Sequence, residues 1–366
     1  MSTIRVNAIQ NTTTTDGGIS IDNSGHVTFD GQALPSAGPL SNRNLIINGA
    51  MQVAQRGTSE TGVTGNGYYQ APDRFKATLA SLGTWTVSQS TEAPDGFSNS
   101  YKWACTTADA SPTANGNVTL RQTIEAQNLQ HLKKGTADAE AVTLSFWVRS
   151  NKTGTYIVNI DAPDSTRSIA KSYTIDTADT WEYKTITYEG DTTGAINNDT
   201  GSGFHVYFWL AAGSTFTSGT LATSWEATTN ANRAVGQVNL ADSTSNEWYL
   251  TGVQLEVGSV ATPFEHRSYG DELQRCQRYY ISQTASVWHC DIDASNTASD
   301  LRAYVAFPTT MRSNPTVTAT IGYTANNSST TLTVQYARPT GFSTYPAQNS
   351  TAGLVLLGNY TASAEF

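Results

Sequence analysis

Residues 204–210 read FHVYFWL and alternate between two kinds of side chain. Successive side chains of a β-strand point to opposite faces of a sheet. The stretch therefore predicts a strand that buries one set of residues in a core and presents the other set on the opposite face. The core set is Phe204, Val206, Phe208 and Leu210, and the opposite set is His205, Tyr207 and Trp209.

The segment around residue 147 follows the same rule. Leu144, Phe146 and Val148 would face the core, so Trp147 and Arg149 would lie on the other face. Short strands separated by runs rich in Gly, Asn, Asp and Thr are typical of a two-sheet sandwich or jelly roll. We expect this fold over residues 41–268, with further strands at 85–89, 101–106, 117–123, 155–160, 181–188 and 247–257.

The composition of the whole chain favours strands. Of its 366 residues 55 are Thr, 10% are aromatic and only 14% are charged. Thr and aromatic residues suit a pleated, half-buried surface, whereas the Glu, Lys and Leu residues that drive long helices are scarce. The fold class we expect is all-β, in two or three domains.

The charge and the apolar runs argue against two classes of partner. Lys and Arg number 21 against 30 Asp and Glu, so the net charge is −9, and no basic run is present to neutralise a phosphate backbone. The longest apolar run, residues 206–212, is far shorter than the ~20 residues that a membrane span needs. We expect no nucleic-acid partner and no membrane span. Because the N-terminus lacks a signal-peptide pattern, we expect assembly in a cytoplasm.

Segments outside these strands have patterns of their own. Residues 1–40 are polar, with short apolar pieces that cannot bury a core within one chain. This segment must be disordered, packed against other copies or docked on something larger.

Residues 123–134 predict a helix that stops at Gly135. Residues 284–366 predict a small C-terminal β domain, with a loop at 339–346.

A second helix is expected from 269, within a connecting segment at 269–283. Tyr269, Leu273, Cys276 and Tyr280 are spaced by four, three and four residues, which is an a/d stripe. Such a stripe either packs on the adjacent sandwich or packs around a symmetry axis with other copies. It is too short to support a coiled coil alone, and both interpretations stay open.

No catalytic group emerges from the sequence. Glu182, Glu189 and Asp191 are close in sequence, but spacing alone does not select the carboxylate pair of a glycosidase. A stretch from Asp291 begins like a calcium-binding loop, but Arg302 stands where the bidentate Glu would be. We therefore expect no enzyme activity, no cofactor and no metal ligand that can be named.

Sugar binding is the function that this composition favours. Trp and Tyr rings can stack on the apolar face of a saccharide, while polar or charged side chains pair with its hydroxyl groups. The alternative is that these rings are covered by loops or by a neighbouring chain. The candidates are Trp147, Arg149, His205, Tyr207 and Trp209 in the sandwich, and Arg302, Tyr304, Phe342 and Tyr345 in the C-terminal block.

Three parts of the chain together resemble one family of proteins. NLIINGAMQVAQRGTS at 44–59 with YYQAPDRFKAT at 68–78 resembles the start of the central domain of bacteriophage tail-fibre and receptor-binding proteins. WYLTGVQLEVGSVATPFEHRSYGDELQRCQRYY at 248–280 resembles the end of that domain and the helix after it, and is the most specific match. FPTTMRSNPTVT at 307–318 and YTASAEF at 360–366 resemble the distal β domain of such fibres.

The resemblance implies an assembly and a location. The central domain would be similar to the jelly roll of carbohydrate-binding modules, and residues 1–40 would trimerise and attach to the virion tail, its baseplate or an adaptor protein. The homotrimer would meet host polysaccharide or lipopolysaccharide through residues 284–366. Related sugar-binding modules often hold a structural calcium ion, which is implied here without ligands. A capsid decoration protein, a glycan depolymerase and a free carbohydrate-binding module remain alternatives.

Overall fold

The computed structural model describes residues 8–10, 18–29, 31–65, 67, 69–284, 303–325, 332–346 and 354–366. The chain divides into two compact units, Met1–Arg267 and Ser268–Phe366. The first unit includes the described residues before residue 41 as well as the sandwich strands. The division falls one residue before the expected end of the sandwich at 268.

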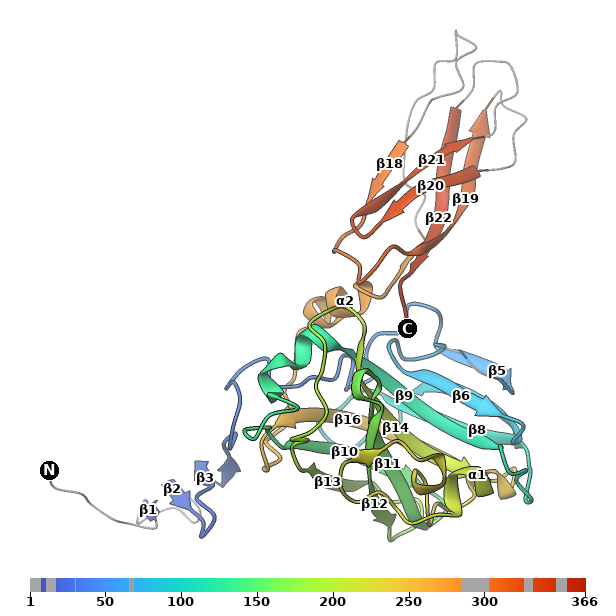
Figure 1. Cartoon of the computed structure of the whole chain (residues 1–366). Coiled ribbons are helices and arrows are strands. Elements are labelled where there is room, and N and C mark those ends of the chain that lie inside the picture. Colours follow the sequence, from blue (N-terminus) through green and yellow to red (C-terminus); the bar gives the residue numbers. More distant parts are fainter. Residues whose placement is uncertain are drawn as a thin grey trace, which may run out of the picture. The chain divides into compact units, whose positions relative to one another are not determined.

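Two six-stranded antiparallel sheets form the body of the first unit (Figure 1). The first, called here the β16 sheet, has the order β13-β10-β16-β8-β7-β5, and the second, the β14 sheet, has the order β15-β12-β11-β14-β9-β6. The strands of the β16 sheet are β5 (Ser59–Val63), β7 (Thr84–Ser90), β8 (Ser100–Thr107), β10 (Val142–Ser150), β13 (Glu182–Tyr188) and β16 (Glu247–Val257). Those of the β14 sheet are β6 (Lys76–Ala80), β9 (Asn117–Glu125), β11 (Gly154–Ala162), β12 (Arg167–Ile175), β14 (Ser202–Ala212) and β15 (Glu226–Ala227).

The core lies between the two sheets. The four residues expected to face it from β14, Phe204, Val206, Phe208 and Leu210, are at most 2% exposed. Phe146 of β10 meets Phe208 edge to face across the core, with ring centroids 5.2 Å apart. Such a pair adds about 0.5–1.5 kcal/mol beyond its area burial. The expected all-β jelly-roll sandwich is confirmed, and so are its six further strands, with shifts of no more than two residues at their ends.

The helix expected at 123–134 is wrong in its start and in its type. β9 continues to Glu125 because Thr123 pairs with His205 of β14 in the ladder. Only the 3₁₀ helix η1 (Ala126–Leu132) follows, and it ends at a left-handed residue with a φ of 49°. A β-branched residue such as Thr suits a strand better than a helix, which is the physical reason for the difference.

A long connection covers part of the outer face of the β14 sheet. Phe216, from the short helix α1 (Ser214–Thr217), lies against Trp209 with ring centroids 5.1 Å apart. Ala222 and Ala234 join the same buried cluster. The short helices of the first unit, besides η1, are η2 (Pro163–Ser165), α1 (Ser214–Thr217), η3 (Asn230–Asn232) and η4 (Leu240–Asp242).

Four short strands near the N-terminus form a separate antiparallel sheet. Ile19 pairs with Phe29, and Ile21 pairs with Val27, so these four side chains share one face. Ile19, Ile21 and Phe29 are 37%, 46% and 53% exposed. One copy of the chain thus leaves an apolar sheet face uncovered. The strands are β1 (Ala8–Gln10), β2 (Gly18–Ile21), β3 (Val27–Phe29) and β4 (Gln32–Ala33).

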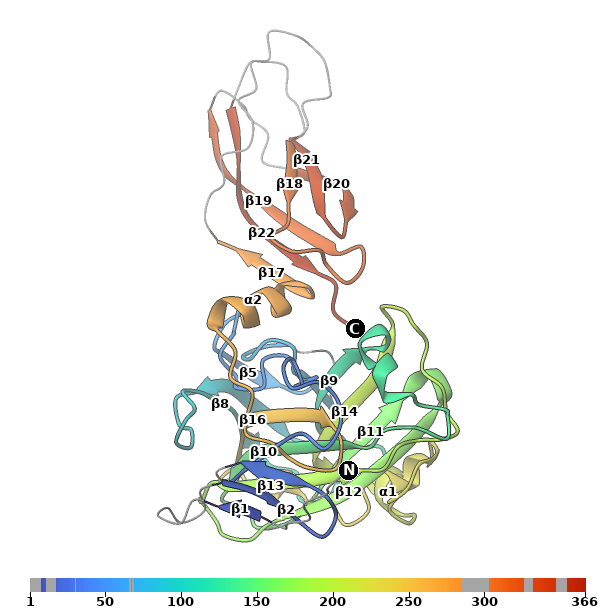
Figure 2. The ribbon, with the colours of Figure 1, turned by 90° about the vertical axis from the view of Figure 1, so that its left-hand side faces the viewer.

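The described residues of the second unit form one helix and two three-stranded sheets (Figure 2). The helix α2 (Tyr269–Gln277) begins where the Ser268 side chain accepts a hydrogen bond from the backbone N–H of Asp271. The sheets have the orders β17-β22-β19 and β18-β21-β20 and enclose a core around Phe307 and Phe342. Their strands are β17 (Tyr280–Gln283), β18 (Ala303–Ala306), β19 (Thr316–Ala325), β20 (Leu332–Arg338), β21 (Gly341–Pro346) and β22 (Leu354–Ser363).

The C-terminal residues return to the start of the second unit. The backbone N–H of Ala364 donates to the carbonyl of Tyr279 at 2.8 Å, and Arg312 Nε donates to the carbonyl of Ala364 at 2.8 Å. The Arg312 guanidinium lies 4.0 Å from the ring centroid of Phe366. Two of the segments quoted for the resemblance, 307–318 and 360–366, therefore meet in space.

Candidate functional site

A pocket with a volume of about 530 Å³ opens on the outer face of the β16 sheet. Its lining includes five aromatic side chains, and we call it the aromatic pocket. Asp95, Ser145 and residues 31–33 add polar residues and backbone to the lining, together with Gly96, Gly252 and residues 261–263. The combination of flat rings with a few polar groups is typical of a small-ligand site. The aromatic residues are Phe97, Trp147, Tyr183, Phe264 and His266.

The ladder places two of these rings side by side. Trp147 of β10 lies opposite Tyr183 of β13 in the register, and their ring centroids are 5.3 Å apart. Gly252 of β16 has a φ of 61°, a conformation that other residues rarely adopt. A Cβ atom at Gly252 would lie 2.8 Å from the Phe97 ring and 3.0 Å from the Trp147 ring. The absence of a side chain at this position lets both rings lie against the sheet.

The other rings come from loops. Phe97 lies between β7 and β8, and its ring centroid is 5.1 Å from that of Phe264, which follows β16. His266 lies 4.9 Å from Phe264 by ring centroids. Burial raises the pKa of Tyr183, although a hydrogen bond with Ser145 acts in the opposite direction. The phenol therefore stays protonated at neutral pH and can donate a hydrogen bond.

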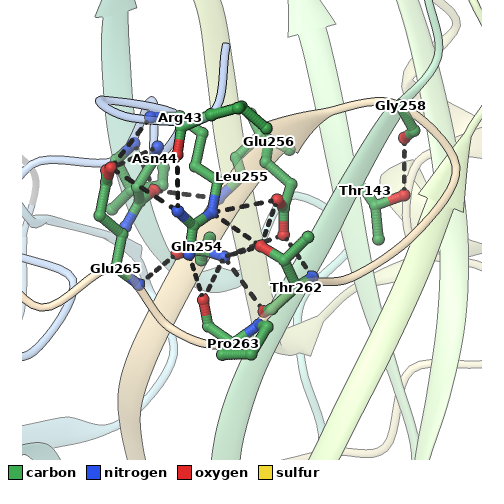
Figure 3. Close-up of polar contacts among 12 residues, drawn as sticks. Arg43, Asn44, Thr143, Gln254, Leu255, Glu256, Gly258, Thr262, Pro263 and Glu265 are labelled. Atoms are coloured by element: carbon green, nitrogen blue, oxygen red, sulfur yellow. Dashed lines mark hydrogen bonds and ion pairs between the residues drawn. The ribbon is translucent and has the colours of Figure 1, made fainter. Parts of the chain in front are cut away.

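A buried polar network beside the pocket, called here the clasp, fixes the loop that carries Phe264 (Figure 3). Glu256 is 1% exposed and accepts hydrogen bonds from the backbone N–H and the hydroxyl of Thr262, at 2.8 and 2.7 Å. Glu265 accepts from the backbone N–H groups of Arg43 and Asn44, at 3.2 and 3.1 Å. Arg43 Nε also donates to Thr262 Oγ1 at 2.7 Å. The clasp thus joins three segments by hydrogen bonds: GVQLE, TPFE and the segment that begins at residue 43.

Of the candidates predicted on β10, only Trp147 lines the pocket. Arg149 forms ion pairs with Glu92 and with Asp179, the second at 3.3 Å, and its guanidinium lies 5.2 Å from the ring centroid of Tyr249. Because two carboxylates already neutralise its charge, Arg149 is occupied by contacts within the chain.

The three candidates on β14 do not share one environment. His205 and Tyr207 are partly exposed on the outer face of the β14 sheet. Trp209 is only 2% exposed, and its Nε1 donates to Oδ1 of Asn159 at 2.8 Å. The connection after β14 covers it, so the prediction of Trp209 as a sugar contact is wrong and its ring packs within the protein. The alternative of loop packing is the one that the structure shows.

The candidates in the C-terminal block also differ in their exposure to solvent. Tyr304 is 55% exposed on β18. Phe342 is fully buried in the core of the second unit, so its prediction as a sugar contact is wrong. Residues 341–346, expected as part of a loop, form β21, which pairs with β18 and β20. Tyr345 lies on this strand, but its side chain is outside the described residues, as is all of Arg302.

The stripe expected on the second helix is not continuous. α2 ends at Gln277, so Tyr280 lies on β17 instead of the helix. Tyr269 is 57% exposed, Leu273 is partly buried and Cys276 is fully buried. The physical reason is that the chain turns at residue 278 into the ladder with β22, which removes the last position from the helical face.

The carboxylates considered for catalysis have other partners. Asp191 is 3% exposed and lies 2.6 Å from Lys134 Nζ and 2.8 Å from Arg167 Nε, which makes it part of a buried ion-pair network. In the part of the chain that the structure describes, no group of three or more His, Cys, Asp or Glu residues is placed to hold a metal ion. Among the same residues, no helix has the length and apolar character needed to cross a membrane.

The remaining rings of the pocket were not among the predicted candidates. Tyr183 becomes a partner of Trp147 only through the strand register, which the sequence alone does not give. Phe264 and His266 stand in the TPFEHR segment, which is part of the most specific match to the fibre family, and that match was the available sign of a special loop.

Comparisons with known proteins add distant similarities. No protein-family model matches the sequence, and no curated protein matches it. Among solved structures, the enzymatically active domain of tailspike protein 4 from bacteriophage CBA120 is 13% identical, with a TM-score of 0.31 over 58% of this chain and 21% of that chain. A putative sugar binding protein from Bacteroides thetaiotaomicron is 11% identical, with a TM-score of 0.33 over 59% of this chain and 100% of that one.

A third similar structure is a family 11 carbohydrate-binding module from Clostridium thermocellum. It is 10% identical, with a TM-score of 0.28 over 56% of this chain and 99% of that one. This chain therefore spans about a fifth of the tailspike domain but nearly all of the two smaller proteins.

Proposed function

We propose that the chain is a carbohydrate-binding structural protein of a bacteriophage tail fibre or spike, which attaches the particle to a glycan on the host surface. The observation that carries the proposal is the aromatic pocket, where Trp147 and Tyr183 form a paired platform beside a carboxylate and a hydroxyl group. Rings of this kind can stack on a sugar while Asp95 and Ser145 pair with its hydroxyl groups. The fibre assignment rests on the sequence resemblance described above.

Assembly is the second part of the proposal. The N-terminal sheet leaves Ile19, Ile21 and Phe29 exposed in one copy. Packing of this face against other copies would remove apolar surface from water and stabilise a homotrimer. Three linked pockets would convert weak affinity for one sugar into avidity at a repetitive surface. Attachment to a virion tail, baseplate or adaptor through this N-terminal segment completes the proposed role.

Glycan binding is tested by comparing Trp147→Ala with the wild type on an array of bacterial polysaccharides and neutral oligosaccharides. We expect saturable wild-type binding without release of reducing sugar, and at least tenfold weaker binding by the variant, about 1.4 kcal/mol. Trp181→Ala is the matched control, because Trp181 is partly exposed near the same sheet edge but does not line the pocket. Equal binding by Trp147→Ala and the wild type would exclude the pocket, and release of reducing sugar would favour a depolymerase.

Assembly is tested by the absolute mass of the full-length protein in solution. A trimer has three times the chain mass of 39.2 kDa, about 118 kDa. Replacing Ile19 and Phe29 by Ser is expected to shift the mass toward that of a single chain. A monomeric wild type would contradict the self-assembling fibre and favour a free binding module.

A further inference from the structure

The outer face of the β14 sheet carries polar and charged side chains in one lateral row across four strands. The register pairs Lys76 of β6 with Arg121 of β9, Arg121 with Tyr207 of β14, and Tyr207 with Asn159 of β11. Paired residues of neighbouring strands point to the same face. The row therefore presents an ammonium, a guanidinium and a phenol next to one another.

A second guanidinium reaches this row from the connection after β14. Arg233 follows η3, and its Cζ lies 4.9 Å from the ring centroid of Tyr207. Arg121 approaches the same tyrosine, with Cζ 5.7 Å from the centroid and Nη1 donating to the phenol oxygen at 3.3 Å. Lys76 Nζ lies 5.3 Å from the ring of Tyr69. Cations and tyrosine rings thus alternate along the face. We call these five residues the cationic row: Lys76, Arg121, Arg233, Tyr69 and Tyr207.

The two guanidinium groups of the cationic row differ in their ion pairs. Arg233 forms an ion pair with Asp161 at 2.5 Å, but Arg121 has no ion pair within the described part of the chain. The Nε atoms of Arg121 and Arg233 are buried and have no hydrogen-bond partner among the described residues. Unpaired buried donors are costly, so an acceptor at this place would stabilise the face.

His205, two residues before Tyr207 on β14, is affected by the same positive charges. Burial lowers its pKa to about 3, and the nearby charges of Arg121, Arg233 and Lys76 act in the same direction. The imidazole is therefore neutral at physiological pH and adds a hydrogen-bonding group without charge. Three cations thus act on His205 within a chain whose net charge is −9.

From this geometry we propose that the cationic row is a second binding site, which recognises an oxyanion on a saccharide. Arg121 and Lys76 would contact the anionic group, and the Tyr207 ring would lie against the sugar. Carboxylate, sulfate and phosphate share the chemistry that a guanidinium recognises. The inference rests on the proposed function in one respect, which is that the ligand is a glycan. A nucleic acid is disfavoured, because the chain is acidic and its basic groups form no extended track for a phosphate backbone.

The test measures binding of the full-length protein to trigalacturonate, to 6-sulfated galactotriose and to neutral galactotriose by titration calorimetry. Arg121→Gln is expected to weaken binding of trigalacturonate at least tenfold and to leave galactotriose binding unchanged. Binding of the acidic sugar, but not of the neutral one, should also fall as salt is raised. Lys133→Gln is the matched control, since it removes the same charge from a side chain that is 53% exposed in a turn. Lys76→Gln serves as a second variant if Arg121→Gln fails to fold.

The outcomes separate this inference from the proposed function. Wild-type binding of trigalacturonate that is unaffected by both row variants would overturn the inference, and so would tighter binding of a single-stranded DNA oligonucleotide. Binding of galactotriose alone would overturn the inference and leave the aromatic pocket standing. Binding of none of the three sugars would overturn both. Row-dependent binding of only one acidic sugar would support the site and identify its anionic group.

Discussion

The outer face of the β16 sheet gathers aromatic rings around a glycine, whereas the outer face of the β14 sheet sets cations between tyrosines. Both faces arise from the same alternation of side chains along a strand, with Trp147 on one and Tyr207 on the other. Their neighbours differ because the strand register and the loops bring Tyr183 and Phe264 to the first, and Arg121 and Arg233 to the second. Two faces of one sandwich can thus favour ligands of different charge.

The largest expected effect is on the free energy of unfolding, and it distinguishes a buried tryptophan on one face from a ligand-binding tryptophan on the other. Trp209→Ala should lower the free energy of unfolding by about 3–5 kcal/mol, because the ring is buried and a cavity would remain. Trp147→Ala should cost much less stability, because Trp147 is partly exposed, and should act mainly on sugar binding. Urea denaturation of the two variants checks the difference. Equal stability losses would contradict the assignment of Trp147 to an open pocket.

A smaller effect is expected at the base of the aromatic pocket. Gly252→Ala should destabilise the fold by about 1–3 kcal/mol, since it combines a left-handed backbone with a Cβ 2.8 Å from the Phe97 ring. The displaced rings should also weaken neutral sugar binding, while binding of an acidic sugar at the cationic row stays unchanged. Thermal unfolding and calorimetry measure the two consequences. Gly270→Ala is the control, because a Cβ at Gly270 meets no atom within 4 Å.

The effect that is smallest at neutral pH is expected at His205, on the other face, because it grows only as the pH falls. The pKa of His205 is about 3 in the folded protein, below the ordinary value of 6.5. As the pH falls below 6.5 the unfolded chain takes up a proton that the folded chain does not, so stability is lost down to about pH 3. The loss is at most about 1.4 kcal/mol per pH unit.

His205→Gln should remove this part of the pH dependence, and Arg121→Gln should reduce it by removing a neighbouring cation. Free energies of unfolding at several pH values between 4 and 7, measured for both variants and the wild type, provide the check. Identical slopes for wild type and His205→Gln would show that His205 is not held neutral by this face.

Much of the fold could be predicted from the sequence, because period-two alternation reports directly which side of a strand is buried. The core set of β14 and the opposite set of β10 follow from that rule alone. The prediction of a helix at 123–134 was wrong at its start, because the spacing of apolar residues cannot show that Thr123 pairs with a residue of β14. Residues 341–346 form the central strand of a sheet, which the local sequence does not indicate because Gly, Ser, Thr and Pro are also common in turns.

The sites were less accessible to prediction than the strands. Alternation shows which side chains face outward from a sheet, but it does not show which of them other segments cover. Trp209 faces outward and is covered by the connection that contains Phe216. The partners of Trp147 and Tyr207 depend on strand order, which links segments far apart in the chain. Arg233, for example, reaches the cationic row from a loop with no motif of its own.

The clasp has a mechanical consequence. The chain enters the sandwich at Arg43 and leaves it at Arg267, and hydrogen bonds join the two ends: Glu265 accepts from the backbone N–H of Arg43 at 3.2 Å, and Arg267 Nη1 donates to the carbonyl of Ile46 at 3.1 Å. If the protein links a particle to a cell, tension would run from the N-terminal segment to the second unit across these few bonds. The twelve sandwich strands lie outside that path, so the binding faces would keep their shape under load until the clasp breaks.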